Sequence, residues 1–212
     1  MAGTSDYYQN KLVDLERGQA YAYPATIYVG LLLCTKGPLA RSTAYALNDT
    51  VSLIVGSTNY LYKCTTAGTT AASAPAYTGT PNEAITDGTA VFTEQTAALQ
   101  AGTAAVEPAV GGYARVGVAA SLAAWAGTQG AGTTIASSGT SATTSNNAVI
   151  TYPLPSATWD AAPSQIWGFA TYDAASAGNL LRYGGLGADQ IVNTGNNVSF
   201  AAGTLIIKLD NA

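Results

Sequence analysis

The feature that most constrains this chain is a series of short β-prone segments, none of them followed by a long amphipathic helix. Apolar, β-branched and aromatic residues alternate with clusters of Gly, Pro, Asn and Asp, which is the pattern of strands joined by turns. The segments are ATIYVGLLLC, YARVGVAA, NAVITYPL, QIWGFATYD, NLLRYGGL, NNVSFAAG and TLIIKLD. A parallel α/β fold would need helices between its strands. The pattern therefore predicts an all-β, antiparallel sandwich similar to a jelly roll.

One short helix is expected, in the opening stretch SDYYQNKLVDLERG. Ser5 is placed to cap its N-terminus, Gly18 is placed to end it, and Tyr8, Leu12 and Leu15 repeat on one face. That face can pack on the chain's own core, or it can dock on a neighbouring subunit. We name Tyr8 and Leu12 as candidate interface residues and keep both packings open.

A passage of different character interrupts the strand series between residues 43 and 96, and we call it the insert. It has turns of its own, STNY and TDGT, and its own β-prone segments, but little bulk for a core. We interpret it as a small β-module inserted at a loop, a position that tolerates insertions. The flanking residues, 1–42 and 97–212, are then predicted to form one discontinuous sandwich domain.

The tract GTQGAGTTIASSGTSATTSNN, residues 127–147, has the composition of a linker. It lies between two strong β-prone segments, so disorder and an extended loop or β-arm against a neighbour fit it equally. If the tract is ordered, we expect a partner to hold it.

Charge is scarce in this chain, at 9% of residues against roughly 25% in an ordinary soluble domain. Hydroxyl, amide and small residues must form much of the surface, which suits a protein packed against copies of itself. The net charge is −4 and no basic run is present, so nucleic acid is not an expected partner. PATIYVGLLLC is too short to span a membrane and the N-terminus lacks the order of a signal peptide, so we expect neither membrane insertion nor secretion.

The residue types that catalysis requires are also scarce. Histidine is absent, which removes the commonest general base and the commonest metal ligand. Five aspartates stand in turn sequences, where Asp ordinarily bonds to nearby backbone amides: Asp49, Asp87, Asp160, Asp173 and Asp189. The glycine-rich GGLGADQ and GTQGAG lack the Lys and the helix of a phosphate-binding loop, so we interpret them as turns. We predict a non-enzymatic protein without a metal or cofactor.

The tryptophans and cysteines are predicted to be internal. Trp125, Trp159 and Trp167 are expected to fill the sandwich core. Cys34 and Cys64 have neither metal-site nor redox spacing, and we expect two buried thiols.

The tyrosines of the insert are expected to be exposed, because a module with so small a core cannot bury them all. This applies to Tyr45 and to the three residues that we name as candidates to face a ligand: Tyr60, Tyr62 and Tyr77.

Arg115 is one of only eight basic residues and stands in the small, apolar run GGYARVGVAA. On a strand, Tyr113 and Arg115 share one face while Val116 and Val118 share the other. The branched residues can then face inward and the arginine outward. We name Arg115 and Tyr113 as candidate interface residues. Arg115 is solvated, or pairs with an acid of its own chain or of a neighbouring subunit, or binds a sugar or anion.

The order of several motifs resembles a family of small bacteriophage virion proteins, described as tail-fibre-like or head decoration proteins. These motifs are YYQNKLVDLERGQAY, PATIYVGLLL, GGYARVGV, SNNAVITYPLPSATW, QIWGFATYDAASAGNLLRYGGL and VNTGNNVSFAAGTLIIKLD. The insert, with YKCTTAGT and TDGT, resembles a small module of phage fibre and adsorption proteins. It departs from that module in SAPAY, where Tyr77 stands in place of the usual Trp.

The resemblance implies a structural protein of the virion, with no catalytic residues to carry over. Within that class we expect a capsid decoration or cement protein, because the chain has neither the heptads nor the repeats of a long fibre shaft. The alternative is a tail fibre or a receptor-binding component that contacts host-surface glycan. We expect assembly in the host cytoplasm, self-association as a trimer, and contact with the major capsid protein or tail components.

Overall fold

The chain is mostly β: of the residues that the structure describes, 37% lie in strands and 8% in helices. The structure, a computed structural model, describes residues 2–140, 142–160 and 162–208. All pairings between its strands are antiparallel, which confirms the predicted all-β, antiparallel fold class. Ser141 of the 127–147 tract, and the end of the last predicted strand from Leu209, lie outside the described residues.

The first half of the chain contains β1 (Ala2–Thr4), α1 (Asp6–Glu16), β2 (Thr26–Cys34), β3 (Ala44–Tyr45), β4 (Thr50–Val55), β5 (Thr58–Thr66), β6 (Gly68–Thr69), β7 (Ala84–Asp87), β8 (Ala90–Glu94) and α2 (Thr96–Gln100). The second half contains β9 (Val116–Ala119), β10 (Trp125–Ala126), β11 (Thr143–Asn146), β12 (Ile150–Thr151), β13 (Gln165–Tyr172), β14 (Leu180–Gln190), β15 (Ser199–Phe200) and β16 (Ile206–Lys208).

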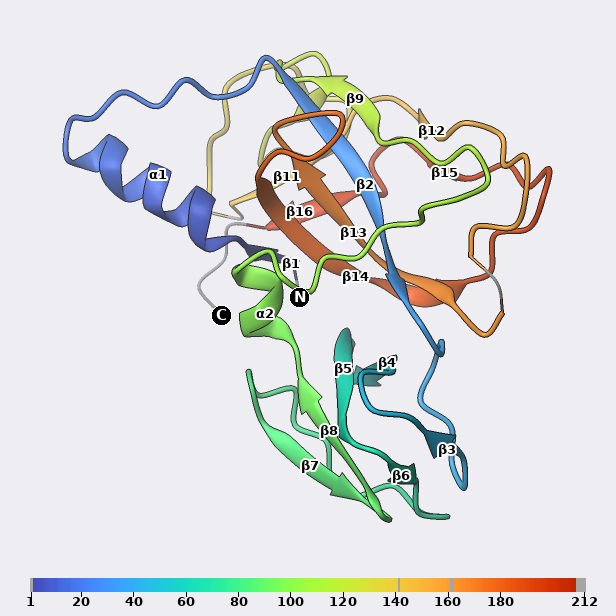
Figure 1. Ribbon diagram of the computed structural model, residues 1–212. Helices are drawn as coiled ribbons and strands as arrows, with labels where there is room; N and C mark the ends of the chain where they lie inside the picture. Colours follow the sequence, from blue (N-terminus) through green and yellow to red (C-terminus); the bar gives the residue numbers. More distant parts are fainter. Residues whose placement is uncertain (1, 141, 161, 209–212) are drawn as a thin grey trace.

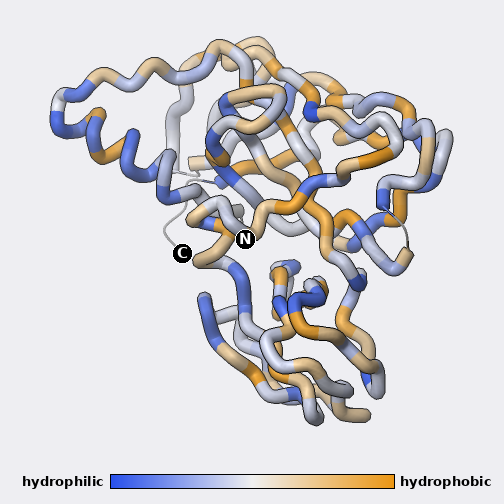
Figure 2. The backbone as a smooth tube through the Cα atoms, in the orientation of Figure 1, coloured by the Kyte–Doolittle hydropathy of each residue, from blue (hydrophilic) through white to orange (hydrophobic). Residues whose placement is uncertain are grey.

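The largest sheet has five strands in the order β1-β14-β13-β2-β9, and we call it the main sheet (Figure 1). Its central strands β2 and β13 pair along their length, from Gln165 opposite Cys34 to Tyr172 opposite Tyr28. Both strands are apolar on both faces, because both faces are covered. In Figure 2 the centre of this sheet is rich in apolar residues, whereas α1 alternates between polar and apolar ones.

One face of the main sheet forms the larger core with two smaller sheets, β10-β11-β16 and β12-β15. Trp125 and Trp159 are buried in this core, and Trp167 is buried on the opposite face. The prediction that the tryptophans fill the core is therefore confirmed. Both cysteines are free and buried, as expected.

The predicted N-terminal helix is present as α1. The Ser5 side chain accepts a hydrogen bond from the backbone N–H of Tyr8 at 3.2 Å, and Gly18 follows the helix with a φ of +80°. Only part of the predicted face packs on the chain: Tyr8 is buried and Leu12 half-buried, but Leu15 is 54% exposed. In Figure 1 the helix stands out from the side of the main sheet.

A second helix, α2, was not predicted. It spans only five residues, TAALQ, which is too short to show the 3.6-residue period by which a helix is recognised. Its one buried side chain is Leu99, which packs beneath the main sheet with Trp167 and Tyr183.

The insert contains a four-stranded sheet, β4-β5-β8-β7, and the short pair β3-β6 (Figure 1). It has an apolar cluster of its own, which includes Val51, Tyr62 and Phe92. Asp189 of β14 joins it to the main sheet by accepting hydrogen bonds from Ser52 Oγ at 2.5 Å and Asn59 Nδ2 at 2.9 Å. The division into a sandwich of residues 1–42 and 97–212 and a module of residues 43–96 stays a prediction.

The described part of the 127–147 tract lies on the chain itself. β11 pairs with both β10 and β16, Gln129 Nε2 donates to Ala136 O at 2.8 Å, and Asn147 Nδ2 donates to Thr133 O at 2.9 Å. Contacts within the chain thus take the place of the partner that we expected to order this tract. A second correction concerns GGLGADQ, which continues β14 and is not a turn.

Candidate functional site

Arg115 is nearly buried, with 9% of its side chain exposed, and it pairs with an acid of its own chain. Its Nε and Nη2 donate to Glu107 Oε2 at 2.9 and 2.5 Å, and its Nη1 donates to the carbonyls of Ala174 at 2.8 Å and Ala177 at 2.7 Å. The guanidinium lies 3.3 Å from the centre of the Tyr172 ring. The expected outward position is therefore wrong. Strand alternation does not apply to Arg115, because β9 begins one residue later, at Val116.

Tyr113 belongs to the same cluster. Its hydroxyl donates to Glu107 Oε1 at 2.6 Å and accepts from the backbone N–H of Leu31 at 2.8 Å. Burial raises the pKa of Tyr113, and the adjacent Glu107 carboxylate raises it further. Gly30 makes room for this arrangement, since a β-carbon there would overlap Glu107 Oε1. We call Glu107, Tyr113, Arg115 and Tyr172 the Arg115 cluster; it ties the segment before β9 to β2 and β13.

Sequence reasoning did not single out Glu107. One signal could have found it: Glu107 is the only acidic residue between Glu94 and Asp160, and it stands eight positions before a lone arginine. A buried charge needs a partner. Because Glu107 and Arg115 have no other charged residue near them in the sequence, their spacing favours a pair between them.

Two of the four insert tyrosines that we expected to be exposed are buried. Tyr62 has no exposed surface and Tyr45 is 5% exposed, while Tyr60 and Tyr77 are half-buried. The Tyr62 hydroxyl accepts from the backbone N–H of Gly79 at 3.2 Å, and the Tyr77 ring packs edge-on against the Tyr62 ring at 5.2 Å. The expectation failed for Tyr62 because the segment before β7 folds back over its ring, and for Tyr45 because its ring packs edge-on against Phe92 at 5.3 Å.

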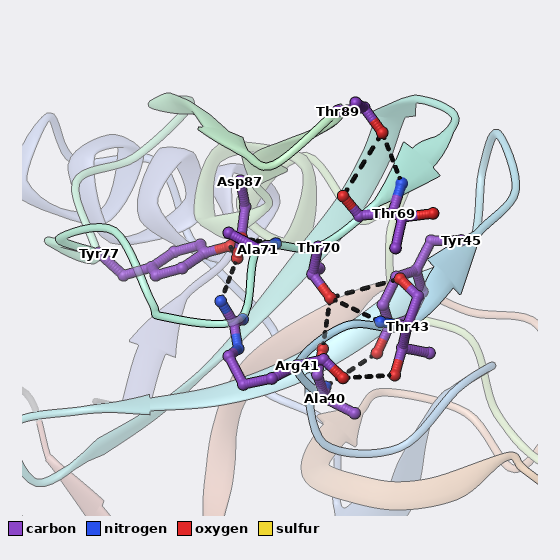
Figure 3. Close-up of polar contacts among 10 residues, drawn as sticks. All are labelled: Ala40, Arg41, Thr43, Tyr45, Thr69, Thr70, Ala71, Tyr77, Asp87 and Thr89. Carbon is purple, nitrogen blue, oxygen red and sulfur yellow. Dashed lines mark hydrogen bonds and ion pairs between the residues drawn. The ribbon is translucent and has the colours of Figure 1, made fainter.

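The TDGT turn of the insert closes a buried polar cluster (Figure 3). Asp87 is fully buried and accepts from Arg41 Nη1 at 2.6 Å, from the Tyr77 hydroxyl at 2.7 Å and from the backbone N–H of Ala71 at 2.9 Å. Burial raises the pKa of Tyr77, and its hydrogen bond to Asp87 adds to that effect. Gly88, with a φ of +65°, has no room for a side chain against the backbone of Thr69. The TDGT motif therefore stabilises the fold of the insert, and Tyr77 takes part in this structural role.

Of the three tyrosines named as ligand-facing, Tyr60 lines a cavity. This cavity has a volume of about 250 Å³ and lies between the insert and the main sheet, with Trp167 and Tyr183 in its walls. Tyr62 and Tyr77 instead face each other within the insert. The structure does not bring the three side chains together as one exposed aromatic platform.

The acidic residues and thiols have structural surroundings. Asp49 and Asp173 bond to turn amides as expected, at 2.8 Å from Ala46 N and 2.6 Å from Asn179 N. Burial, with a contribution from Asp189, raises the pKa of the Cys34 thiol to about 12, so it carries no thiolate at neutral pH. Within residues 2–140, 142–160 and 162–208, no three His, Cys, Asp or Glu side chains gather as metal ligands. No helix in these ranges is long and apolar enough to cross a membrane.

Comparison with known proteins points to one family. Residues 88–208 match the model of a family described as podophage GP4 fiber I protein gp80. The match covers more than half of the chain, from the last turn of the insert to β16. No curated protein matches the chain.

Proposed function

Because the chain belongs to the podophage GP4 fiber I protein gp80 family, and so is a structural protein of a phage virion, we propose that it is a non-enzymatic component of a tail fibre. The family match carries this proposal, since it covers β13 and β14 of the main sheet and the strands that close the larger core. Capsid decoration, which we favoured from the sequence, becomes the competing outcome of the test.

The chemistry of the described residues supports a structural role. Buried charges often mark active sites. Here they form ion pairs that connect elements of the fold, as Glu107 does with Arg115 and Asp87 with Arg41. Such bonds hold a fibre subunit in one shape.

Self-association, as a trimer, is part of the proposal. Val13 and Leu15 of α1 are 53% and 54% exposed and lie beyond the part of the helix that packs on the main sheet. A surface with so little charge can meet copies of itself without burying unpaired ions.

Copy number and position in purified particles test the proposal. Quantitative mass spectrometry against the major capsid protein, with antibody labelling in electron microscopy, should find a few copies per particle at the tail. Copies in proportion to the capsid subunits, spread over the head, would establish decoration instead. Light scattering of the purified chain tests the trimer, and a monomer at high concentration would contradict it.

A further inference from the structure

Arg182 is a second buried arginine, and the described part of the chain offers it no acidic partner. It lies in β14 on the core face of the main sheet, opposite Thr171 of β13, and is 8% exposed. Among the described residues it makes no hydrogen bond and no ion pair; its guanidinium carbon lies 5.2 Å from the centre of the Tyr8 ring. A cation–π contact replaces only part of the hydration that a buried guanidinium loses. The Arg182 nitrogens are not among the fully buried polar atoms without a partner, so a ligand in the neighbouring cavity can reach them and complete their hydrogen bonds.

Arg182 lines a cavity of about 430 Å³ at the end of the larger core. Thr171 lies beside it in the cavity wall, and Tyr23 enters from the connection between α1 and β2. Trp125 forms another part of the wall, and its Nε1–H has no hydrogen-bond partner in the described part of the chain although it is buried. A charged donor without an acceptor among the described residues thus borders this cavity, and a tryptophan whose buried Nε1–H is also unpaired there forms part of the wall.

These groups favour, as the ligand of the cavity, an anion with a single negative charge. A guanidinium binds a carboxylate through two parallel hydrogen bonds, which is the geometry that satisfies Arg182 best. A phosphate dianion suits the cavity less well, because Arg182 is the one charged residue among the described residues of its wall and the chain as a whole carries a net charge of −4.

The remaining wall is suited to a sugar ring. Tyr23 and Trp125 provide aromatic side chains, and Ser121 and Thr144 provide hydroxyl groups, of which the Thr144 hydroxyl already donates to Ala126 O at 2.8 Å and is left to accept. The apolar faces of a sugar ring pack on aromatic side chains, while its hydroxyls need polar partners at its edge. An aspartate or glutamate side chain from a protein partner would supply the carboxylate but no ring for these faces.

We propose that this cavity binds a carboxylate-bearing sugar of the uronic acid class, with Arg182 as the anchor of its carboxylate. The proposal goes beyond a tail-fibre role, which the chain can have even if this cavity binds nothing.

Calorimetric titration of the full chain compares methyl β-D-glucuronide with methyl β-D-glucoside, which has the same ring without the carboxylate. We expect the glucuronide to bind at least tenfold more tightly. Arg182→Gln should abolish that difference, Arg182→Lys should keep part of it, and Trp125→Phe should weaken glucuronide binding several-fold. Arg17→Gln is the matched control, because it removes an arginine whose side chain is 73% exposed, and it should change nothing.

Thermal unfolding gives a second, independent measurement. Without ligand, Arg182→Gln should keep or raise the unfolding midpoint, because it removes an unpaired buried charge. The glucuronide should raise the midpoint of the natural chain and leave that of Arg182→Gln unchanged.

Three results would overturn the proposal. The first is equal binding of glucuronide and glucoside. The second is succinate binding as tightly as the glucuronide, which would mean that the cavity binds any carboxylate. The third is a large loss of stability in Arg182→Gln without any effect on sugar binding.

Discussion

The surroundings of Arg115 and Arg182 differ in their hydrogen-bond acceptors. The described residues supply acceptors to Arg115 and none to Arg182. Both are about nine-tenths buried and both lie against the main sheet, Arg115 over Tyr172 and Arg182 opposite Thr171. Arg115 is bonded to a carboxylate and two carbonyls, so it holds the fold together. Burial alone therefore does not tell a structural arginine from a binding one; the number of acceptors around it does.

The largest loss of stability is expected when Arg115, like Arg182 in the described part of the chain, is left without a carboxylate partner. Glu107→Gln leaves the guanidinium buried without its carboxylate and should lower the free energy of unfolding by about 3 kcal/mol. Urea unfolding followed by tryptophan fluorescence measures this. Asp14→Asn is the control, since it breaks the exposed pair with Arg17 and should cost less than about 0.5 kcal/mol. Equal small losses in both variants would show that the Arg115 cluster adds little to stability.

A smaller loss is expected when the space beneath the Arg115 cluster is filled. Gly30→Ala places a β-carbon against Glu107 Oε1 and should cost about 1–3 kcal/mol, because the pair must shift to make room. Gly187→Ala, also in the main sheet, meets no atom within 4 Å and serves as the control. The same urea unfolding measures both. If Gly30→Ala is as stable as Gly187→Ala, the cluster is not packed as tightly as described.

The converse change gives Arg182 an acid of its own. Thr171→Asp puts a carboxylate opposite Arg182 and should change the free energy of unfolding by no more than about 1 kcal/mol, since the gain of a pair offsets the burial of a second charge. It should also abolish binding of methyl β-D-glucuronide in the calorimeter. Thr171→Val removes the hydroxyl without adding charge and should still bind. If Thr171→Asp binds the glucuronide as tightly as the natural chain, Arg182 does not contact the ligand.

The smallest effect concerns the ionisation of Tyr23. Burial raises the pKa of Tyr23 to about 12, and the Arg182 charge lowers it in part. Arg182→Gln should therefore raise this pKa further, measured by ultraviolet titration with Tyr23→Phe as the blank. Because the folded pKa exceeds the unfolded value of about 10, Tyr23 contributes stability that is lost as the pH rises from 10 through 12. An unchanged Tyr23 pKa in Arg182→Gln would show that the guanidinium lies too far from Tyr23 to affect its ionisation.

Features that depend on residues close together in the sequence were predictable. The cap of α1 at Ser5 and its end before Gly18 depend on a few consecutive residues, and both are as expected. Strand segments with β-branched and aromatic residues became β2, β13 and β14 for the same reason. Helix α2 was missed because five residues are too few to show a period.

The candidate site was less predictable, because most contacts that bury its side chains come from residues distant in the chain, such as Ala174 and Ala177 on Arg115. Tyr62 is buried by a loop that returns to it 17 residues later, with Gly79, and alternation along β5 carries no information about that loop. Arg115 was assigned to a solvent-facing position by the pleat of a strand that in fact begins after it.

The sequence by itself determined the all-β class, the one capped N-terminal helix, the buried tryptophans and thiols, and the virion family, because these follow from composition, local periodicity and motif order. The tertiary structure alone decided which charges are paired. Glu107 reaches Arg115 through the loop before β9, whereas Arg182 meets Tyr23 and Trp125 only after the elements around β14 have packed. Whether a buried charge stabilises the fold or awaits a ligand depends on which acceptors that packing brings within hydrogen-bond distance.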